Sequence, residues 1–163
     1  AGLAGGFILG MTIMQLGLFG VAFGFGIPMA YAAIQWRLPL ECWLLFTANI
    51  CYSFAYDTEY AMVDRDDDKR LGIRTSALTL GRWDIGAVMA SYAGMLALLL
   101  ALGLNLSLAW PYYLGLLVAA AMMGYHWFLI RERSREGCFK AFRHNNWVGG
   151  VIFAGIALSY FYE

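Results

Sequence analysis

Charge, cysteine and histidine are scarce in this sequence. Charged residues make up only 13% of the 163 residues, whereas a soluble domain carries about a quarter, so the composition excludes an ordinary soluble protein. The three cysteines and two histidines have neither disulfide nor metal-ligand spacing, and we expect the cysteines and His126 to be packed residues. Phosphate-binding loops, H-E-x-x-H and nucleophile elbows are absent. The basic residues are interleaved with acids, which argues against nucleic acid as a partner.

Long apolar runs fill most of the chain. Hydrophobic residues make up 61% of it, and the mean hydropathy is +0.62, as expected for a polytopic membrane protein. We predict an all-α bundle of about five transmembrane helices, and we expect Pro28 to kink the first of them. The predicted spans are residues 11–34, 40–63, 83–104, 112–130 and 147–162.

The eleven basic residues gather in two places. Five lie in residues 65–82 and five in residues 131–143, and only Arg37 stands elsewhere. Both groups fall in polar connectors that the predicted spans leave between them, residues 64–82 and 131–146. Because alternating spans place these two connectors on the same side of the membrane, the positive-inside rule predicts that both face the cytoplasm.

More than half of the chain's eleven acidic residues lie in residues 56–68, YDTEYAMVDRDDD. If the second span continues through this stretch as a helix, four of its residues share one face. These residues are Asp57, Tyr60, Asp64 and Asp68. Carboxylates at this spacing repel each other unless a cation neutralises them, and a hard divalent cation with oxygen ligands is the natural partner. We therefore predict functional roles for Asp57 and Asp64, and we interpret Asp66 and Asp67 as part of a solvated acidic loop.

The acidic stretch and two flanking blocks carry a resemblance to a known family. The blocks are AFGFGIPMAYAAIQ, YDTEYAMVDRDDDKRLGIRTSALTLG and CFKAFRHNNWVGGVIFAGIALSY. They resemble the UbiA superfamily of intramembrane prenyltransferases, and most closely its bacterial para-hydroxybenzoate polyprenyltransferases. The likeness runs from about Gly17 to the C-terminus, and the central block resembles the family's second aspartate-rich motif. It implies the C-terminal half of a nine-helix bundle in the bacterial inner membrane.

The resemblance also implies a reaction and a set of site residues. The expected function is transfer of a polyprenyl group from an isoprenoid diphosphate to the ring of para-hydroxybenzoate in ubiquinone biosynthesis, with magnesium (Mg²⁺) as cofactor. Asp64 and Asp68 resemble the paired aspartates that ligate magnesium, and Asp57 is a further expected metal ligand. Three more residues are expected beside the cofactor and the diphosphate: Tyr60, Lys69 and Arg74.

Two features of the family pattern are absent from the sequence. One is the first aspartate-rich motif with its N-D-x-x-D-x-x-x-D pattern, and the other is a basic Y-P-x-x-K-R segment before the first span. We therefore expect residues 1–163 to be a partial transmembrane prenyltransferase domain that does not turn over alone.

Two alternatives stay open. One is a prenyltransferase for another aromatic acceptor, such as homogentisate or a naphthoate. The other is a non-enzymatic membrane protein that binds a divalent cation, although a conduction pathway favours acids spread over several spans. A CDP-alcohol phosphotransferase is disfavoured because its D-G-x-x-A-R pattern is absent.

Overall fold

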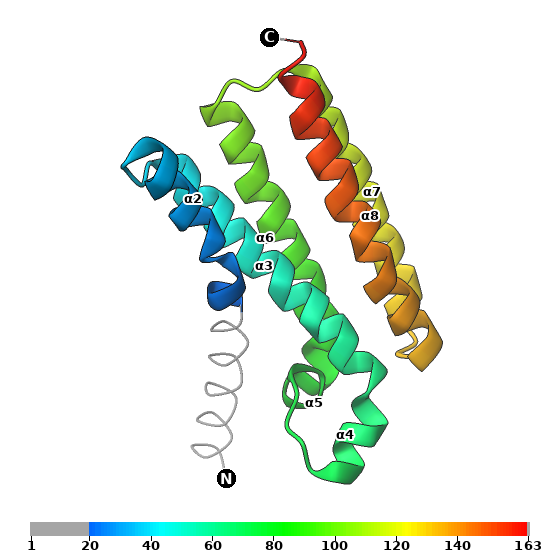
Figure 1. Cartoon of the computed structure of the whole chain (residues 1–163). Coiled ribbons are helices and arrows are strands. Elements are labelled where there is room, and N and C mark those ends of the chain that lie inside the picture. Colours follow the sequence, from blue (N-terminus) through cyan, green and yellow to red (C-terminus); the bar gives the residue numbers. More distant parts are fainter. Residues whose placement is uncertain (1–19, 163) are drawn as a thin grey trace.

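The structure is a computed structural model that describes residues 20–162, and helices dominate this part of the chain (Figure 1). This confirms the all-helical fold class. The elements are α2 (Gly26–Gln35), α3 (Leu40–Val63), α4 (Arg65–Leu71), α5 (Ser76–Leu80), the short 3-10 helix η1 (Gly81–Trp83), α6 (Asp84–Asn105), α7 (Trp110–Ile130) and α8 (Arg135–Ser159). Residues 11–19 of the first predicted span lie outside the described residues.

Four long helices form the bundle. α3 packs against α6 and α8, and α7 packs against α6 and α8. The short α2 lies on α3, while α4 and α5 sit at the end of the bundle opposite the C-terminus (Figure 1). Because α8 begins near α4, the acidic segment and the first turns of α8 meet at one end of the molecule.

Two helical stretches are long and apolar enough to cross a membrane, Ser76–Asn105 and Trp110–Ile130. α3 and α8 have 24 and 25 residues, which exceeds the roughly 20 residues that a bilayer requires. Both carry polar residues near the α4 end of the bundle, which lowers their mean hydropathy. The count of five spans therefore stays a prediction.

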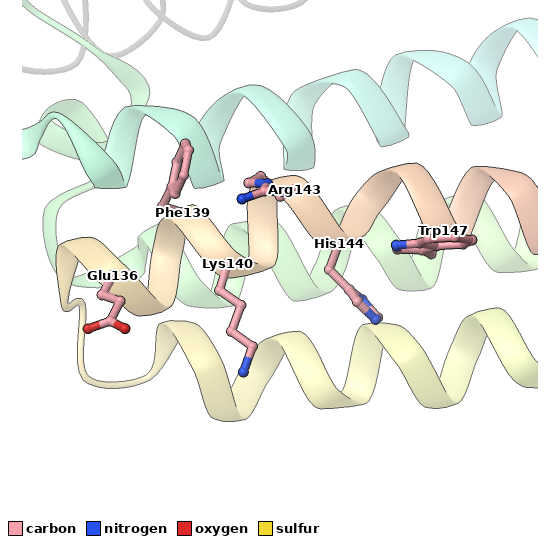
Figure 2. A pocket seen from close by; sticks show the side chains of 6 residues that line it. All are labelled: Glu136, Phe139, Lys140, Arg143, His144 and Trp147. Carbon is pink, nitrogen blue, oxygen red and sulfur yellow. The ribbon is translucent and has the colours of Figure 1, made fainter.

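The last predicted span begins too late. α8 starts at Arg135, where Ser134 caps it by accepting a hydrogen bond from the N–H of Gly137 at 3.2 Å. The polar residues up to position 146 form its first half rather than a loop. Figure 2 shows four of them on the helix, Glu136, Lys140, Arg143 and His144. A helix that packs one face against α3 and α7 can keep polar residues on its other faces, and such a segment has no apolar run to reveal it.

One connector differs from its expected form, whereas the expected effect of Pro28 is observed. The connector 64–82 is mostly helical, because it contains α4, α5 and η1. The helix before Gln35 is interrupted at Phe25, within one turn of Pro28. This is where a proline acts, since its ring clashes with the carbonyl four residues earlier and it has no N–H to donate.

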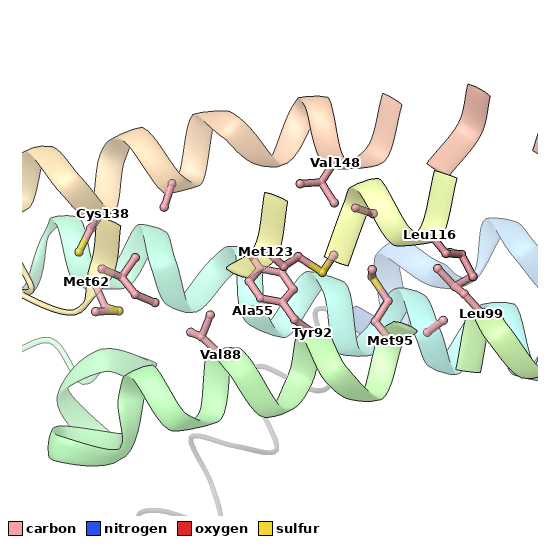
Figure 3. Packing of buried hydrophobic residues seen from close by; sticks show 14 of the residues in the cluster. Ala55, Met62, Val88, Tyr92, Met95, Leu99, Leu116, Met123, Cys138 and Val148 are labelled. Atoms are coloured by element: carbon pink, nitrogen blue, oxygen red, sulfur yellow. The ribbon is translucent and has the colours of Figure 1, made fainter. Parts of the chain in front are cut away.

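The core lies where the four long helices meet. Figure 3 shows large buried side chains from every one of them, among them Met62, Tyr92, Met123 and Val148, each at most 2% exposed. The sequence-based expectation for the cysteines is confirmed: all three are free thiols, two of them buried and one half-buried. Large apolar side chains cover the outside of the bundle, which suits contact with lipid.

Candidate functional site

The acidic segment folds as two helices that meet at Asp64. α3 ends at Val63, and Asp64 has φ −95° and ψ 9°, in the sparsely populated bridge region where active-site residues are common. Its N–H donates to the carbonyl of Tyr60 at 3.4 Å, and the N–H of Asp68 donates to the carbonyl of Asp64 at 2.8 Å. The span thus ends at Val63 as predicted, and the helical course assumed for the shared face is interrupted at Asp64: the hydrogen bonds continue, but the backbone bends into α4.

The order of the charged residues along α4 stabilises this short helix. Its first turn contains Asp66, Asp67 and Asp68, and its last turn contains Lys69 and Arg70. Acids near the N-terminus and bases near the C-terminus both interact favourably with the helix dipole. The helix stops at a glycine in position 72 with φ 69°, a left-handed conformation that glycine adopts without steric cost.

Asp64 lines an open cleft at the bend. The cleft has a volume of about 520 Å³, and its other lining residues are Tyr60, Val63, Arg135, Glu136 and Phe139. Asp64 is half-buried. A terminal guanidinium nitrogen of Arg135 lies 3.6 Å from its carboxylate, and Arg135 also donates a hydrogen bond of 3.1 Å to Asp67. The Asp64 carboxylate is therefore reachable from open space and already has a cation nearby.

The remaining predicted site residues are spread around this bend. Asp57 and Asp68 are half-buried, whereas Lys69 and Arg74 are exposed. Lys69 lines a different cleft of about 510 Å³, whose other basic residues are Arg65, Arg82 and Arg133. The structure thus brings Asp64 and Tyr60 together in one cleft and places Lys69 in another.

The oxygen donors at the bend fit magnesium. No group of three or more histidine, cysteine, aspartate or glutamate side chains lies close enough to hold a metal ion within residues 20–162. Magnesium does not require such a cage, because it commonly binds one or two carboxylates and completes its shell with water and substrate phosphates. Asp64 and Asp68, one turn apart and both partly accessible, can supply that pair.

A buried carboxylate anchors the acidic segment to the rest of the bundle. Asp84, the first residue of α6, has no exposed side-chain surface and contacts two arginines. Arg65 donates to it at 2.6 Å and also to the carbonyl of Ala77 at 2.7 Å. Arg133 donates through two nitrogens, at 2.7 Å to Oδ1 and 3.0 Å to Oδ2. We call Asp84, Arg65 and Arg133 the arginine clamp.

The arginine clamp joins three segments of the chain. Arg65 comes from α4, Asp84 from α6, and Arg133 from the turn between α7 and α8, where its φ is 53°. The hydrogen bonds that Arg133 donates to Asp84 raise the pKa of its guanidinium above its usual value, so this cation stays charged. In the sequence, Asp84 is the one charged residue of the predicted span 83–104, which indicated that it has a specific role. Its two arginine partners could not be identified from the sequence.

A second buried polar cluster lies between the long helices. Its members are Glu59 on α3, Tyr92 on α6, His126 on α7, and His144 and Asn145 on α8. The side chains of Glu59 and His126 are fully buried and lie 3.1 Å apart. The expectation that His126 is packed is confirmed, but its hydrogen-bond partners were not foreseen. Glu59 is an acid inside the predicted span 40–63, and this position could have indicated a buried role. The aspartates that follow it drew the attention instead.

Comparison with known proteins gives a consistent result. The model of the UbiA prenyltransferase family matches residues 10–149. The chain is 57% identical over 141 residues to a 4-hydroxybenzoate octaprenyltransferase of Cupriavidus pinatubonensis, covering 86% of this chain and 50% of that protein. A relative of the same name from Cupriavidus metallidurans is 58% identical, with 86% and 48% covered. One from Methylobacillus flagellatus is 56% identical over 144 residues, with 88% and 49% covered.

The chain spans about half the length of the curated relatives that it matches. No solved structure matches it significantly.

Proposed function

The chain belongs to the UbiA prenyltransferase family, and from this premise we propose that the protein transfers a polyprenyl group to the ring of 4-hydroxybenzoate, in a step of ubiquinone synthesis. The observation that carries the proposal is the identity of 57% with relatives named 4-hydroxybenzoate octaprenyltransferase, in a chain whose Asp64 faces an open cleft. The donor in this proposal is a polyprenyl diphosphate, and the acceptor is a small aromatic acid.

Asp64 and Asp68 are the proposed magnesium ligands. A bound magnesium ion would neutralise the diphosphate and make it a better leaving group. The two aspartates supply hard oxygen donors at the bend between α3 and α4, and their partial exposure leaves room for substrate phosphate beside them. Asp57 lies about two turns earlier on α3, and its role as a further ligand stays a prediction.

Cations near the bend are the proposed partners of the diphosphate. Arg135 already lies beside Asp64, and Lys69 and Arg74 are exposed within the connector that follows. Fixed positive groups at the leaving group stabilise the negative charge that develops as the carbon–oxygen bond breaks. In the same reaction a carbon–carbon bond forms at the aromatic ring and the ring carbon loses a proton.

Aromatic side chains form the apolar side of the same region. The rings of Tyr56 and Tyr60 lie 4.5 and 4.9 Å from the ring of Phe142, measured between centroids. Tyr60 also lines the cleft that contains Asp64. We propose that these rings cover the first isoprene unit, since aromatic faces attract the positive charge that grows on an allylic carbon and exclude water from it.

The proposed location is the bacterial inner membrane, with the acidic segment on the cytoplasmic side. The basic residues at the α4 end of the bundle support this orientation. Five of them lie within residues 65–82 and five within residues 131–143.

The test is a chimera in which this chain replaces the matched half of the Cupriavidus pinatubonensis relative. Membranes that contain the chimera are supplied with labelled 4-hydroxybenzoate, a polyprenyl diphosphate and a magnesium series. We expect Asp64→Asn and Asp68→Asn to lower product formation by at least about 100-fold, because even outer-shell partners of a metal contribute about 10- to 100-fold.

Asp66→Asn is the matched control, since Asp66 lies on α4 but is exposed, and it should keep most of the activity. Product from homogentisate but not from 4-hydroxybenzoate would replace the proposed acceptor. Normal turnover by Asp64→Asn at ordinary magnesium would refute the metal assignment. Magnesium binding without transfer to any aromatic acceptor would favour a non-enzymatic cation-binding protein.

A further inference from the structure

His126 and His144 lie in direct contact, with Nε2 of the first 2.9 Å from Nδ1 of the second. His126 is fully buried, whereas His144 is partly exposed. The pair therefore connects the interior of the bundle to its surface. These are the only two histidines in the chain, and the proposed prenyl transfer uses neither of them.

The hydrogen bonds around His126 determine where its first proton lies. Asn145 donates from Nδ2 to Glu59 at 2.6 Å, which leaves its Oδ1 to accept from the hydroxyl of Tyr92 at 2.9 Å. The single proton of Tyr92 is thus committed to Asn145. Nδ1 of His126 faces the Tyr92 oxygen at 3.2 Å and a Glu59 oxygen at 3.1 Å. Both neighbours are acceptors, so Nδ1 carries a hydrogen.

When the pair carries one positive charge, the proton between its two rings has two arrangements. When His126 is an imidazolium, its Nε2–H donates to Nδ1 of His144. When the proton moves across the 2.9 Å contact, His144 becomes the imidazolium and donates back to Nε2. The two arrangements contain the same number of protons and differ only in which ring holds the charge.

A buried acid lies beside His126, and basic side chains lie on the cleft side of His144. The titratable groups that contact the two rings are Glu59 on α3, Tyr92 on α6 and Tyr125 on α7. Tyr52 on α3 donates to the backbone carbonyl of Asn145 beside them. The charged residues that line the same cleft as His144 are Glu136, Lys140 and Arg143 on α8. An ionised Glu59 requires a compensating cation, because its side chain is fully buried in a medium of low dielectric constant. Among the described residues only His126 contacts it as a basic group.

His144 opens onto a cleft on the outer side of α8. The cleft has a volume of about 330 Å³, and Figure 2 shows its lining residues. In this view Lys140 and His144 point from α8 toward α7, and both approach the ring of Tyr125, His144 with a centroid distance of 5.7 Å. Because the cleft is open and His144 is partly exposed in it, a proton on His144 can exchange with solvent.

We propose that His126 and His144 form a proton relay between the buried polar cluster and the cleft on α8. The proton in the bond between the two rings moves from Nε2 of His126 to Nδ1 of His144, His144 then releases the proton on its Nε2 to water, and the reverse path reloads His126. Substitution on an aromatic ring releases one proton, so such a route would serve the proposed reaction. The relay itself follows from the hydrogen bonds and does not depend on that reaction.

The test uses the whole chain in lipid bilayers, with a heavy nitrogen isotope in histidine only. Because both histidines belong to the relay, solid-state NMR reports on no other site. We expect a nitrogen–nitrogen coupling across the hydrogen bond, and a pH titration in which the signals of both rings change together. Two rings that titrate separately, or a His126 whose protonation never changes, would overturn the relay.

A variant gives an independent measurement. In His144→Gln the glutamine can hold the hydrogen bond but cannot carry a second proton. We expect exchange of the His126 N–H protons with water to slow several-fold, while Asn146→Gln, an exposed neighbour on α8, leaves it unchanged. An unaltered exchange rate in His144→Gln would mean that the contact is only structural. If this variant does not fold, the titration of the unmodified chain alone decides.

Discussion

Substitution of Asp84 by asparagine should destabilise the bundle more than any other single loss of charge near α4. The side chain of Asp84 is fully buried, while those of Arg65 and Arg133 are 23% and 33% exposed. Removing one partner of a fully buried ion pair costs about 3–5 kcal/mol, because the other charge is left without compensation. Here both arginines can regain water, and each keeps at least one bond to a backbone carbonyl. We therefore expect a loss of about 2 kcal/mol in the free energy of unfolding.

The assay is reversible unfolding of the chain by SDS in mixed micelles, followed by circular dichroism. Asp66→Asn is the matched control, since it removes the same charge from an exposed position at the same end of the molecule, and it should change stability by less than about 0.5 kcal/mol. Arg133→Gln, alone and combined with Asp84→Asn, completes a double-mutant cycle. A cost for Asp84→Asn within about 0.5 kcal/mol of zero, or a cycle without coupling, would show that the arginine clamp does not hold the segments together.

Three further predictions concern the bundle and its orientation. Single cysteines placed at Arg74 and at Arg131, in a chain without its native cysteines, should react with a membrane-impermeant reagent only from the cytoplasmic side; labelling from outside intact cells would reverse the orientation. Gly115→Val should cost about 1–3 kcal/mol of stability, because a Cβ there would lie 3.1 Å from the Cα of Gly155, whereas Gly124→Val on the same helix meets no atom within 4 Å; equal unfolding midpoints for the two variants would contradict the close packing of α7 on α8. Tyr112→Phe should cost about 1 kcal/mol of stability, since the Tyr112 hydroxyl donates to the carbonyl of Leu99 at 2.6 Å; equal unfolding midpoints for Tyr112→Phe and Tyr113→Phe would refute a role for this bond.

The sequence predicted the parts of the fold that depend on long apolar runs. α3, with bounds at positions 40 and 63, matched the expected span, and α6 and α7 began and ended within two residues of theirs. The start of α8 was missed because its first half is amphipathic: buried residues alternate with polar ones, so no continuous apolar run marks it as helix. Hydropathy therefore located membrane-length segments well and amphipathic segments poorly.

The candidate site was predictable in composition but not in geometry. The aspartates of residues 56–68 indicated a cation site through their number and spacing alone. The bend at Asp64 was not predictable, because it depends on how α4 is held by Arg65 against α6. Nor were the partners of Glu59, since His126 and Asn145 lie 67 and 86 residues away in the chain.

The two buried polar clusters together explain how the cleft at Asp64 is held in place. In lipid the hydrophobic effect does not drive one helix against another, so packing and interhelical hydrogen bonds fix how each helix is rotated. Glu59 bonds to α7 and α8 five residues before Asp64, and the arginine clamp fixes α4 one residue after it. The bend is thus held on both sides by directional contacts. A substitution in either cluster should therefore alter the geometry at Asp64 before it unfolds the bundle, although neither cluster touches the proposed metal ligands.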